Sequence, residues 1–193
     1  MVLINDQLDG FDWVSAMPLL PPERQAKVLR YRKETDRIQC VAAWLLLRKA
    51  CKELLSLHEV PPLAFGKHGK PFFPSLPQVN FNLSHCSEAV ACVVDYVPVG
   101  IDIETVKPIS KELMDYVLND EEYHQVIASA QPDVTFMKLW TQKESFLKLS
   151  GNGLCDNLKS LLDDVDKTIF HTDVDPCGKY VYTLARETLK KQP

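Results

Sequence analysis

The pattern of hydrophobic and polar positions predicts three strands in the middle of the chain. Residues 79–84 alternate apolar and polar side chains, as a half-buried strand does. Residues 89–94 form a nearly continuous apolar run, which is typical of a central strand. Residues 97–104 are expected to form a third strand, with Pro98 early enough to lie at its edge.

The N-terminal part is expected to contribute one strand and two helices. A short strand is predicted over residues 2–4, and a basic helix over residues 23–33, where proline in the first turn is tolerated. An apolar stripe at helical spacing predicts a second helix over residues 36–57. Residues 63–78 are rich in proline and predict an irregular, exposed connection.

The C-terminal part is predicted to repeat this mixture. Asn119 followed by Glu122 resembles a helix cap with an acid at the third position. Pro132 ends that helix, and Asp133 is expected to cap the next one, which extends to about Leu149. Strands follow near Ile169 and over residues 180–185. The order predicts an α+β fold of two similar lobes in tandem, residues 1–96 and 97–193.

Composition and charge exclude several classes of protein. The 193 residues carry a net charge of −4, so any phosphate-bearing partner must meet a local cluster of cations, and no nucleic-acid partner is expected. The longest apolar run, Cys40–Leu47, is too short for a membrane span, and the first residues lack the pattern of a signal peptide. A cytoplasmic protein without a membrane partner is therefore expected. The six cysteines form no CxxC pair and are interpreted as structural thiols.

Residues 99–104, Val-Gly-Ile-Asp-Ile-Glu, place two carboxylates on one face of a strand. Side chains two residues apart share a face, so Asp102 and Glu104 point the same way, while Ile101 and Ile103 point into the core. Two such carboxylates repel each other unless a cation lies between them, and Mg²⁺ is the simplest candidate. The alternative interpretation is a solvent-facing acidic edge.

A second chemical segment is expected on a helix. Glu144 and Lys148 are four residues apart and therefore lie on one side of it. They are either a surface ion pair, or a third carboxylate beside the strand pair and a cation aimed at a phosphate. Trp140 and Phe146 in the same segment are interpreted as core residues.

Three further segments supply positively charged side chains or let the backbone come close to a ligand. Gly69 permits close approach, and Lys70 supplies a cation on a loop stiffened by Pro71. Ser84 and His85 end a strand, where side chains face a cleft. Residues 24–37 hold six Lys or Arg against two acids and are either a solvated face or an anion site.

In their order along the chain these motifs resemble a known family. Residues 81–85, 99–104 and 140–148, with 69–71 upstream, are similar to the motif series of the 4′-phosphopantetheinyl transferases, in particular of the surfactin-synthetase-activating (Sfp) type. The resemblance covers roughly residues 23–155. It implies a pseudo-dimeric monomer of two α+β lobes with the active site in the cleft between them.

The resemblance also implies a reaction and its residues. Such enzymes transfer the phosphopantetheine arm of coenzyme A to a serine of an apo acyl or peptidyl carrier protein and release 3′,5′-ADP. The resemblance implies that Mg²⁺, or alternatively Mn²⁺, is held by Asp102, Glu104 and Glu144. It implies that Lys148 contacts the phosphates, and that Glu144 or a metal-bound water accepts the serine proton. The implied coenzyme A contacts are Lys27, Arg37 and His85 at the phosphates and Gly69, Lys70, Pro71 and Ser84 at the adenosine end.

Two other functions remain open at this point. A Mg²⁺-dependent nuclease or phosphohydrolase also uses paired acids and a lysine. The third hypothesis is a non-catalytic module that binds a carrier protein or coenzyme A. The sequence does not select the carrier protein or the pathway.

Overall fold

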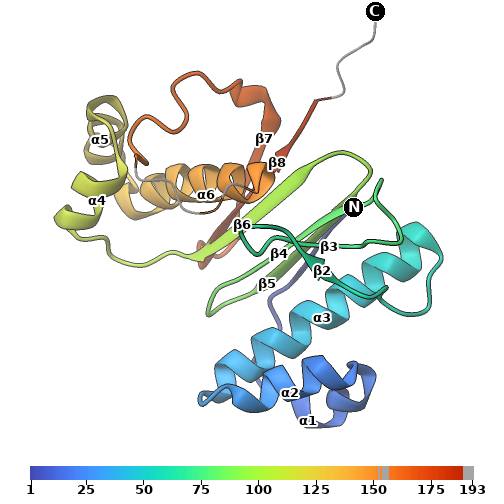
Figure 1. The fold of residues 1–193 in the computed structure, drawn as a ribbon. Helices are drawn as coiled ribbons and strands as arrows, with labels where there is room; N and C mark the ends of the chain where they lie inside the picture. Colours follow the sequence, from blue (N-terminus) through green and yellow to red (C-terminus); the bar gives the residue numbers. More distant parts are fainter. Residues whose placement is uncertain (152, 154–156, 189–193) are drawn as a thin grey trace, which may run out of the picture.

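The computed structural model describes residues 1–151, 153 and 157–188 and shows two similar units, each a three-stranded sheet covered by a long helix (Figure 1). All pairs of neighbouring strands within these two sheets are antiparallel. The first unit contains β1 (Val2–Asn5), α3 (Glu34–Leu55), β4 (Asn80–His85) and β5 (Val90–Asp95). The second contains β6 (Val99–Thr105), α6 (Pro132–Ser150), β7 (Phe170–Val174) and β8 (Tyr180–Arg186).

The two units share one topology. Each runs strand, helix, strand, strand, and the strand orders β1-β5-β4 and β6-β8-β7 place the last strand of each unit in the middle of its sheet. The predicted fold class, α+β with two similar lobes in tandem, is therefore confirmed. The boundary between residues 96 and 97 stays a prediction.

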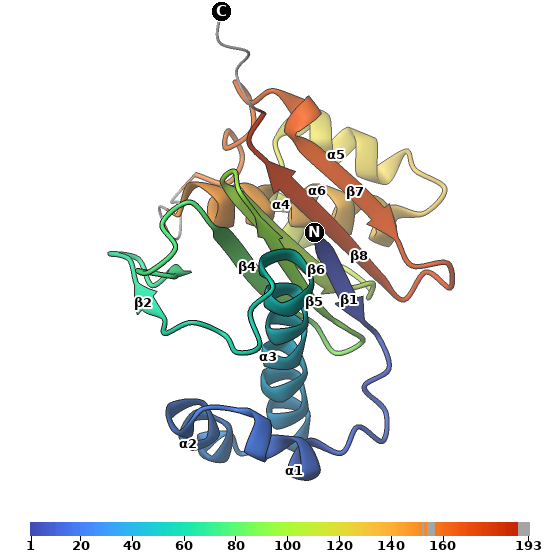
Figure 2. The same cartoon turned by 90° about the vertical axis from the view of Figure 1, so that its right-hand side faces the viewer.

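Shorter elements surround these units. The segments α1 (Trp13–Ala16), η1 (Met17–Leu19) and α2 (Pro22–Arg30) lie beside one end of α3 (Figure 2). Strands β2 (Ala64–Phe65) and β3 (Pro71–Phe72) form a hairpin within the connection expected to be irregular. Helices α4 (Lys111–Val117) and α5 (Asp120–Ile127) accompany α6, and η2 (Lys167–Ile169) precedes β7. Within the described part of the chain, no helix combines the length and apolarity needed to cross a bilayer.

The apolar run of β5 is explained by burial on both faces. Val90, Cys92 and Val94 join the core under α3, whereas Ala91 and Val93 join a second core between the two sheets. Strand β6 contributes Val99, Ile101 and Ile103 to this second core. The predicted thiols Cys40, Cys51 and Cys92 are buried and unpaired, and Cys155 lies outside the described residues.

Strands β4 and β6 meet through side chains of β4. Asn82 Oδ1 accepts a hydrogen bond of 3.1 Å from the Ile101 amide, and Ser84 Oγ accepts one of 3.4 Å from the Ile103 amide. In its sheet β6 pairs only with β8, so these amides have no strand partner on the other side. Buried amides must find acceptors, and Asn82 and Ser84 supply them.

Helix α6 crosses β6 at Gly100, where the absence of a side chain allows close contact. A Cβ atom at Gly100 would lie 2.1 Å from the Ser145 carbonyl oxygen and 2.4 Å from the Leu149 nitrogen. The face of β6 opposite the inter-sheet core, which carries Asp102 and Glu104, therefore lies directly against α6.

The cap predicted with Asn119 is confirmed, but the one predicted with Asp133 is wrong. Asn119 and Glu122 form a reciprocal capping box at the start of α5. Helix α6 already begins at Pro132, and Asp133 Oδ1 instead accepts a hydrogen bond of 3.2 Å from the Ile109 amide. Proline at the first helical position needs no hydrogen-bond acceptor, which moves the helix start one residue earlier.

A buried lysine joins α4, α5 and α6. The side chain of Lys143 is 1% exposed, and its Nζ donates to the Val117 carbonyl at 3.0 Å, to Glu122 Oε2 at 2.7 Å and to the Leu158 carbonyl at 2.7 Å. All three ammonium hydrogens thus have an acceptor. The Lys143 ammonium consequently fixes the side of α6 that faces α5.

Substituting Gly100 by alanine is expected to destabilise the protein. The added methyl group would overlap the backbone of α6, and overpacking of this kind costs about 1–3 kcal/mol or more. Urea unfolding followed by tryptophan fluorescence measures the effect. Gly66→Ala is the control because its Cβ meets only the Lys70 carbonyl at 3.6 Å. Equal midpoints for the two variants would contradict the close packing of α6 on β6.

Lys143→Met is expected to lower the free energy of unfolding by about 3–5 kcal/mol, since it leaves Glu122 and two carbonyl groups without their buried cation. Lys138→Met removes an exposed lysine from the same helix and should change it by less than about 0.5 kcal/mol. Denaturant unfolding of both variants checks this. A Lys143→Met protein as stable as Lys138→Met would show that the buried ammonium contributes no net stability.

Candidate active site

The two acidic residues of β6 face α6, as the alternation of the strand predicts. Asp102 is bonded by Lys148 and Glu104 by Trp140, and both partners come from α6. The Trp140 indole nitrogen donates to Glu104 Oε1 at 3.2 Å. Trp140 packs in the core of the second unit, as expected, but it also holds one carboxylate of the site.

Asp102, Ser84 and Lys148 form a compact polar group. Lys148 Nζ lies 2.5 Å from Asp102 Oδ1 and 2.8 Å from Ser84 Oγ, while Ser84 donates to the same Asp102 oxygen at 3.0 Å. With the Ile103 amide as second donor to its oxygen, the Ser84 hydroxyl uses its one hydrogen and both lone pairs. Ser84 therefore ties β4 to both β6 and α6.

The second oxygen of Asp102 is available to a ligand. Asp102 is 3% exposed, and its Oδ2 is the single buried side-chain polar atom of the described residues without a hydrogen-bond partner. Leaving such an atom unpaired in the interior is costly, and in native proteins it commonly marks a site for an ion or a ligand.

Two further carboxylates feel the charge of Asp102. Burial raises the pKa of Glu104, and repulsion from Asp102 raises it further, against the opposing hydrogen bond of Trp140. Burial also raises the pKa of Glu144, again with repulsion from Asp102, and the Lys148 charge opposes this. The repulsion from Asp102 therefore places Glu144 within electrostatic reach of β6.

This donor set fits a hard divalent cation in its chemistry. Asp102 repels both Glu104 and Glu144 and has one unpartnered oxygen, and carboxylate oxygens are the ligands that Mg²⁺ prefers. In the described ranges, however, no three His, Cys, Asp or Glu side chains are already grouped closely enough to hold a metal ion. The cation that contacts Asp102 here is the ammonium of Lys148.

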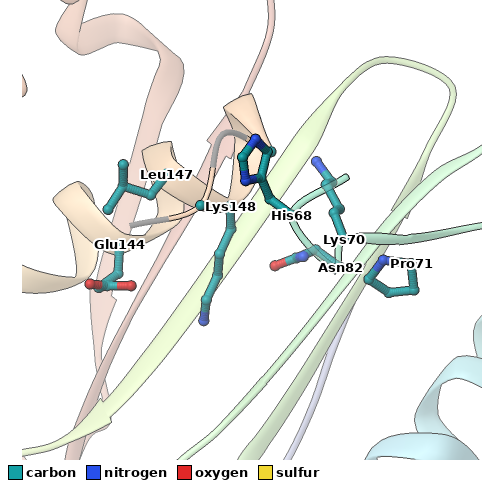
Figure 3. Close-up of a pocket in the computed structure, with 10 residues that line it drawn as sticks. His68, Lys70, Pro71, Asn82, Glu144, Leu147 and Lys148 are labelled. Atoms are coloured by element: carbon teal, nitrogen blue, oxygen red, sulfur yellow. The ribbon is translucent and has the colours of Figure 1, made fainter. Parts of the chain in front are cut away.

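A cavity of about 310 Å³ opens beside these residues (Figure 3). Glu144 and Lys148 project from α6 on one side of it, and His68, Lys70 and Pro71 of the hairpin lie on the other. The complete lining also includes Gly69, Asn82, Leu147, Gly151 and Gly153. The predicted groups at 69–71 and at 144–148 therefore share one cavity, although they are far apart in the sequence.

The predicted phosphate-binding residues are only partly brought together. His85 lies at the end of β4, and partial burial of its ring, followed by the positive charge of Lys148, lowers its pKa. The charges of Lys27 and Asp36 also act on His85, which places them nearby. Arg37 is engaged elsewhere: its guanidinium stacks 5.3 Å from the Trp13 ring centre, and its Nε donates to the Tyr31 carbonyl at 3.0 Å.

Two residues at this site were not predicted from the sequence. Asn82 lines the cavity and accepts from the Ile101 amide, and an asparagine inside a strand that alternates apolar and polar residues is a signal for such a role. His68 lies on the cavity wall beside Gly69, directly before the predicted motif at residues 69–71.

Two family models match the chain, one in each half. The model described as 4′-phosphopantetheinyl transferase superfamily matches residues 98–189, which include β6 and α6. The model described as 4′-phosphopantetheinyl transferase, N-terminal, matches residues 9–96. Together they cover both units of the fold except strand β1.

Curated relatives agree with these matches. The chain is 34% identical over 142 residues to the 4′-phosphopantetheinyl transferase Sfp of Bacillus subtilis (strain 168), which covers 72% of this chain and 63% of that protein. It is 33% identical over 180 residues to a 4′-phosphopantetheinyl transferase of Bacillus subtilis, covering 89% of this chain and 80% of the relative. With the L-aminoadipate-semialdehyde dehydrogenase-phosphopantetheinyl transferase of Saccharomyces cerevisiae it shares 31% identity over 170 residues, 80% of this chain and 61% of the relative.

The match thus spans under two thirds of Sfp and of the yeast relative, but four fifths of the second Bacillus subtilis protein. Both halves of the chain and the acidic motifs of β6 and α6 lie within the matched regions. The chain therefore belongs to the 4′-phosphopantetheinyl transferase family and is of the Sfp type.

Proposed function

We propose that this protein transfers the 4′-phosphopantetheine arm of coenzyme A to the serine hydroxyl of an apo acyl or peptidyl carrier protein, in a Mg²⁺-dependent reaction that releases 3′,5′-ADP. One observation carries the proposal: Glu144 and Lys148 line a cavity whose other wall is the 68–71 turn, and Lys148 contacts the buried Asp102 of β6. Family membership supports the same reaction.

The carboxylates and the lysine have distinct tasks in this proposal. Asp102, Glu104 and Glu144 would hold Mg²⁺, with Mn²⁺ as the alternative, and the ion would neutralise negative charge on the pyrophosphate. Lys148 would exchange its contact with Asp102 for the phosphates and stabilise the departing 3′,5′-ADP. Glu144 lines the cavity and is the candidate acceptor of the serine proton.

The remaining residues would hold coenzyme A. Lys27 and Lys148 both lie within electrostatic reach of His85, and Lys27 and His85 would meet phosphate groups. Arg37 would first have to leave Trp13 and the Tyr31 carbonyl. Gly69, Lys70 and Pro71 form the wall that would receive the adenosine end, with Ser84 at the junction of the two units.

Glu144→Gln is expected to lower kcat by about 100-fold or more, because a positioned general base contributes about 10²–10⁴-fold. Asp102→Ala should be impaired to a similar degree. Mass spectrometry of apo carrier proteins incubated with coenzyme A and Mg²⁺ measures the added arm. Glu53→Gln, an exposed residue of α3, is the control and should retain full turnover. Full turnover by Glu144→Gln would refute the role given to that residue.

Removal of divalent ions is expected to abolish transfer. EDTA should stop modification of the carrier, and excess Mg²⁺ or Mn²⁺ should restore it, because the phosphates and three carboxylates then regain a counter-ion. Undiminished transfer in EDTA would rule out the metal. Cleavage of nucleic acid or phosphoesters without arm transfer would favour a hydrolase, and binding of coenzyme A or a carrier without any turnover would favour a non-catalytic module.

A further inference from the structure

The ammonium of Lys70 connects the hairpin to the second unit. Its Nζ donates to the Leu149 carbonyl at 3.0 Å and to the Val99 carbonyl at 3.2 Å. Lys70 and Leu149 are 79 residues apart in the sequence. One side chain therefore bridges the β2–β3 hairpin, the start of β6 and the end of α6.

Both acceptors lie where α6 crosses β6. Val99 precedes Gly100, whose missing side chain lets the backbone of Leu149 approach. The Leu149 carbonyl belongs to the last turn of α6, where carbonyl groups have no helical donor and where a positive charge is favourable. Lys70 satisfies this carbonyl and carries the favourable charge.

The Lys70 side chain also lies beside the cavity residue Gly151, directly after α6. Its Cδ lies 3.3 Å from where a Cβ of Gly151 would stand, and His68 of the same turn lies equally close to Gly153. The turn itself is closed by hydrogen bonds of 2.9 Å between Gly66 and the Lys70 carbonyl and between Gly69 and the Gly66 carbonyl. The hairpin has strands of only two residues, so its own strand pairing contributes little to holding its position.

We infer that Lys70 is a positioning residue: by binding the carbonyl groups of Val99 and Leu149 it holds the 66–71 turn against α6 and so sets the width of the cavity for coenzyme A. This inference rests on the proposed function. Burial lowers the pKa of Lys70, which agrees with an ammonium enclosed between backbone groups rather than one presented to solvent. Lys70 thus acts through the backbone of the turn and leaves the transferred phosphoryl group to Lys148.

The test compares Lys70→Met, which keeps the length of the chain but loses the donors, with Lys70→Arg, which restores donors. Lys67→Met removes an exposed lysine from the same turn and is the matched control. We expect Lys70→Met to raise the KM for coenzyme A about tenfold, with kcat and the KM for the carrier changed less than about threefold. Lys70→Arg should recover most of the loss, and Lys67→Met should resemble the unsubstituted protein.

A second measurement does not depend on activity. Hydrogen exchange of the amides in residues 64–72 should become at least about tenfold faster in Lys70→Met but not in Lys67→Met, because the turn loses its attachment. Unchanged exchange in Lys70→Met would overturn the inference, and so would a fall in kcat at constant KM, which would make Lys70 a catalytic cation. Absence of transfer by the unsubstituted protein, with the expected exchange pattern, would refute the proposed function and keep the attachment.

Discussion

The contact between β4 and β6 is the constraint on which the site depends. Among the described residues β6 has a strand partner on only one side, so its Ile101 and Ile103 amides donate to side-chain oxygens of Asn82 and Ser84 in place of another strand. These two bonds fix how far β6 is displaced along β4. Because Asp102 lies between the two bonded residues of β6, the same contact fixes the carboxylate relative to the first unit. The Ser84 hydroxyl then links that carboxylate to Lys148.

The electrostatics of the site follow from this arrangement. Asp102 is buried, the partly buried Glu104 and Glu144 lie within its electrostatic reach, and the Lys148 ammonium contacts Asp102. Repulsion from Asp102 raises the pKa values of both Glu104 and Glu144. Such an arrangement stores unfavourable interactions that a bound cation relieves, and it is typical of sites shaped by function more than by stability. The rest of the molecule supplies the compensating burial, in three separate hydrophobic cores.

The period-two pattern of residues 99–104 was enough to place Asp102 and Glu104 on one face, because the isoleucines between them demand a core. Spacing along α6 likewise placed Glu144 and Lys148 on one side. The partners of charged residues could not be predicted, since they depend on which elements meet. Lys143 stands beside Glu144 in the sequence yet points to α5, and Arg37 is stacked on Trp13.

The shortest helices and strands also could not be predicted from the pattern of hydrophobic and polar positions. Helix α4 has seven residues and too short an apolar stripe to reveal its period, and the β2–β3 hairpin is defined by two pairs of residues. The prediction of the site placed Asp102, Glu104, Glu144 and Lys148 correctly on long regular elements, and the roles of these residues stay a prediction. It was incomplete where a loop or a distant aromatic ring decides the position of a cation, as it does for Lys70 and Arg37.

Because Gly100 has no side chain, the two walls of the cavity differ in how closely they are packed against β6. Helix α6 is seated on β6 without an intervening side chain, so Glu144 and Lys148 belong to the same rigid block as Asp102. The opposite wall is the β2–β3 hairpin, which Lys70 connects to Val99 and Leu149. We therefore expect a change in the size of the bound molecule to be accommodated at the hairpin rather than at α6. The distances among Asp102, Glu144 and Lys148 would then stay constant from one ligand to the next. A difference in ligand size would therefore leave the geometry of these reacting groups unchanged.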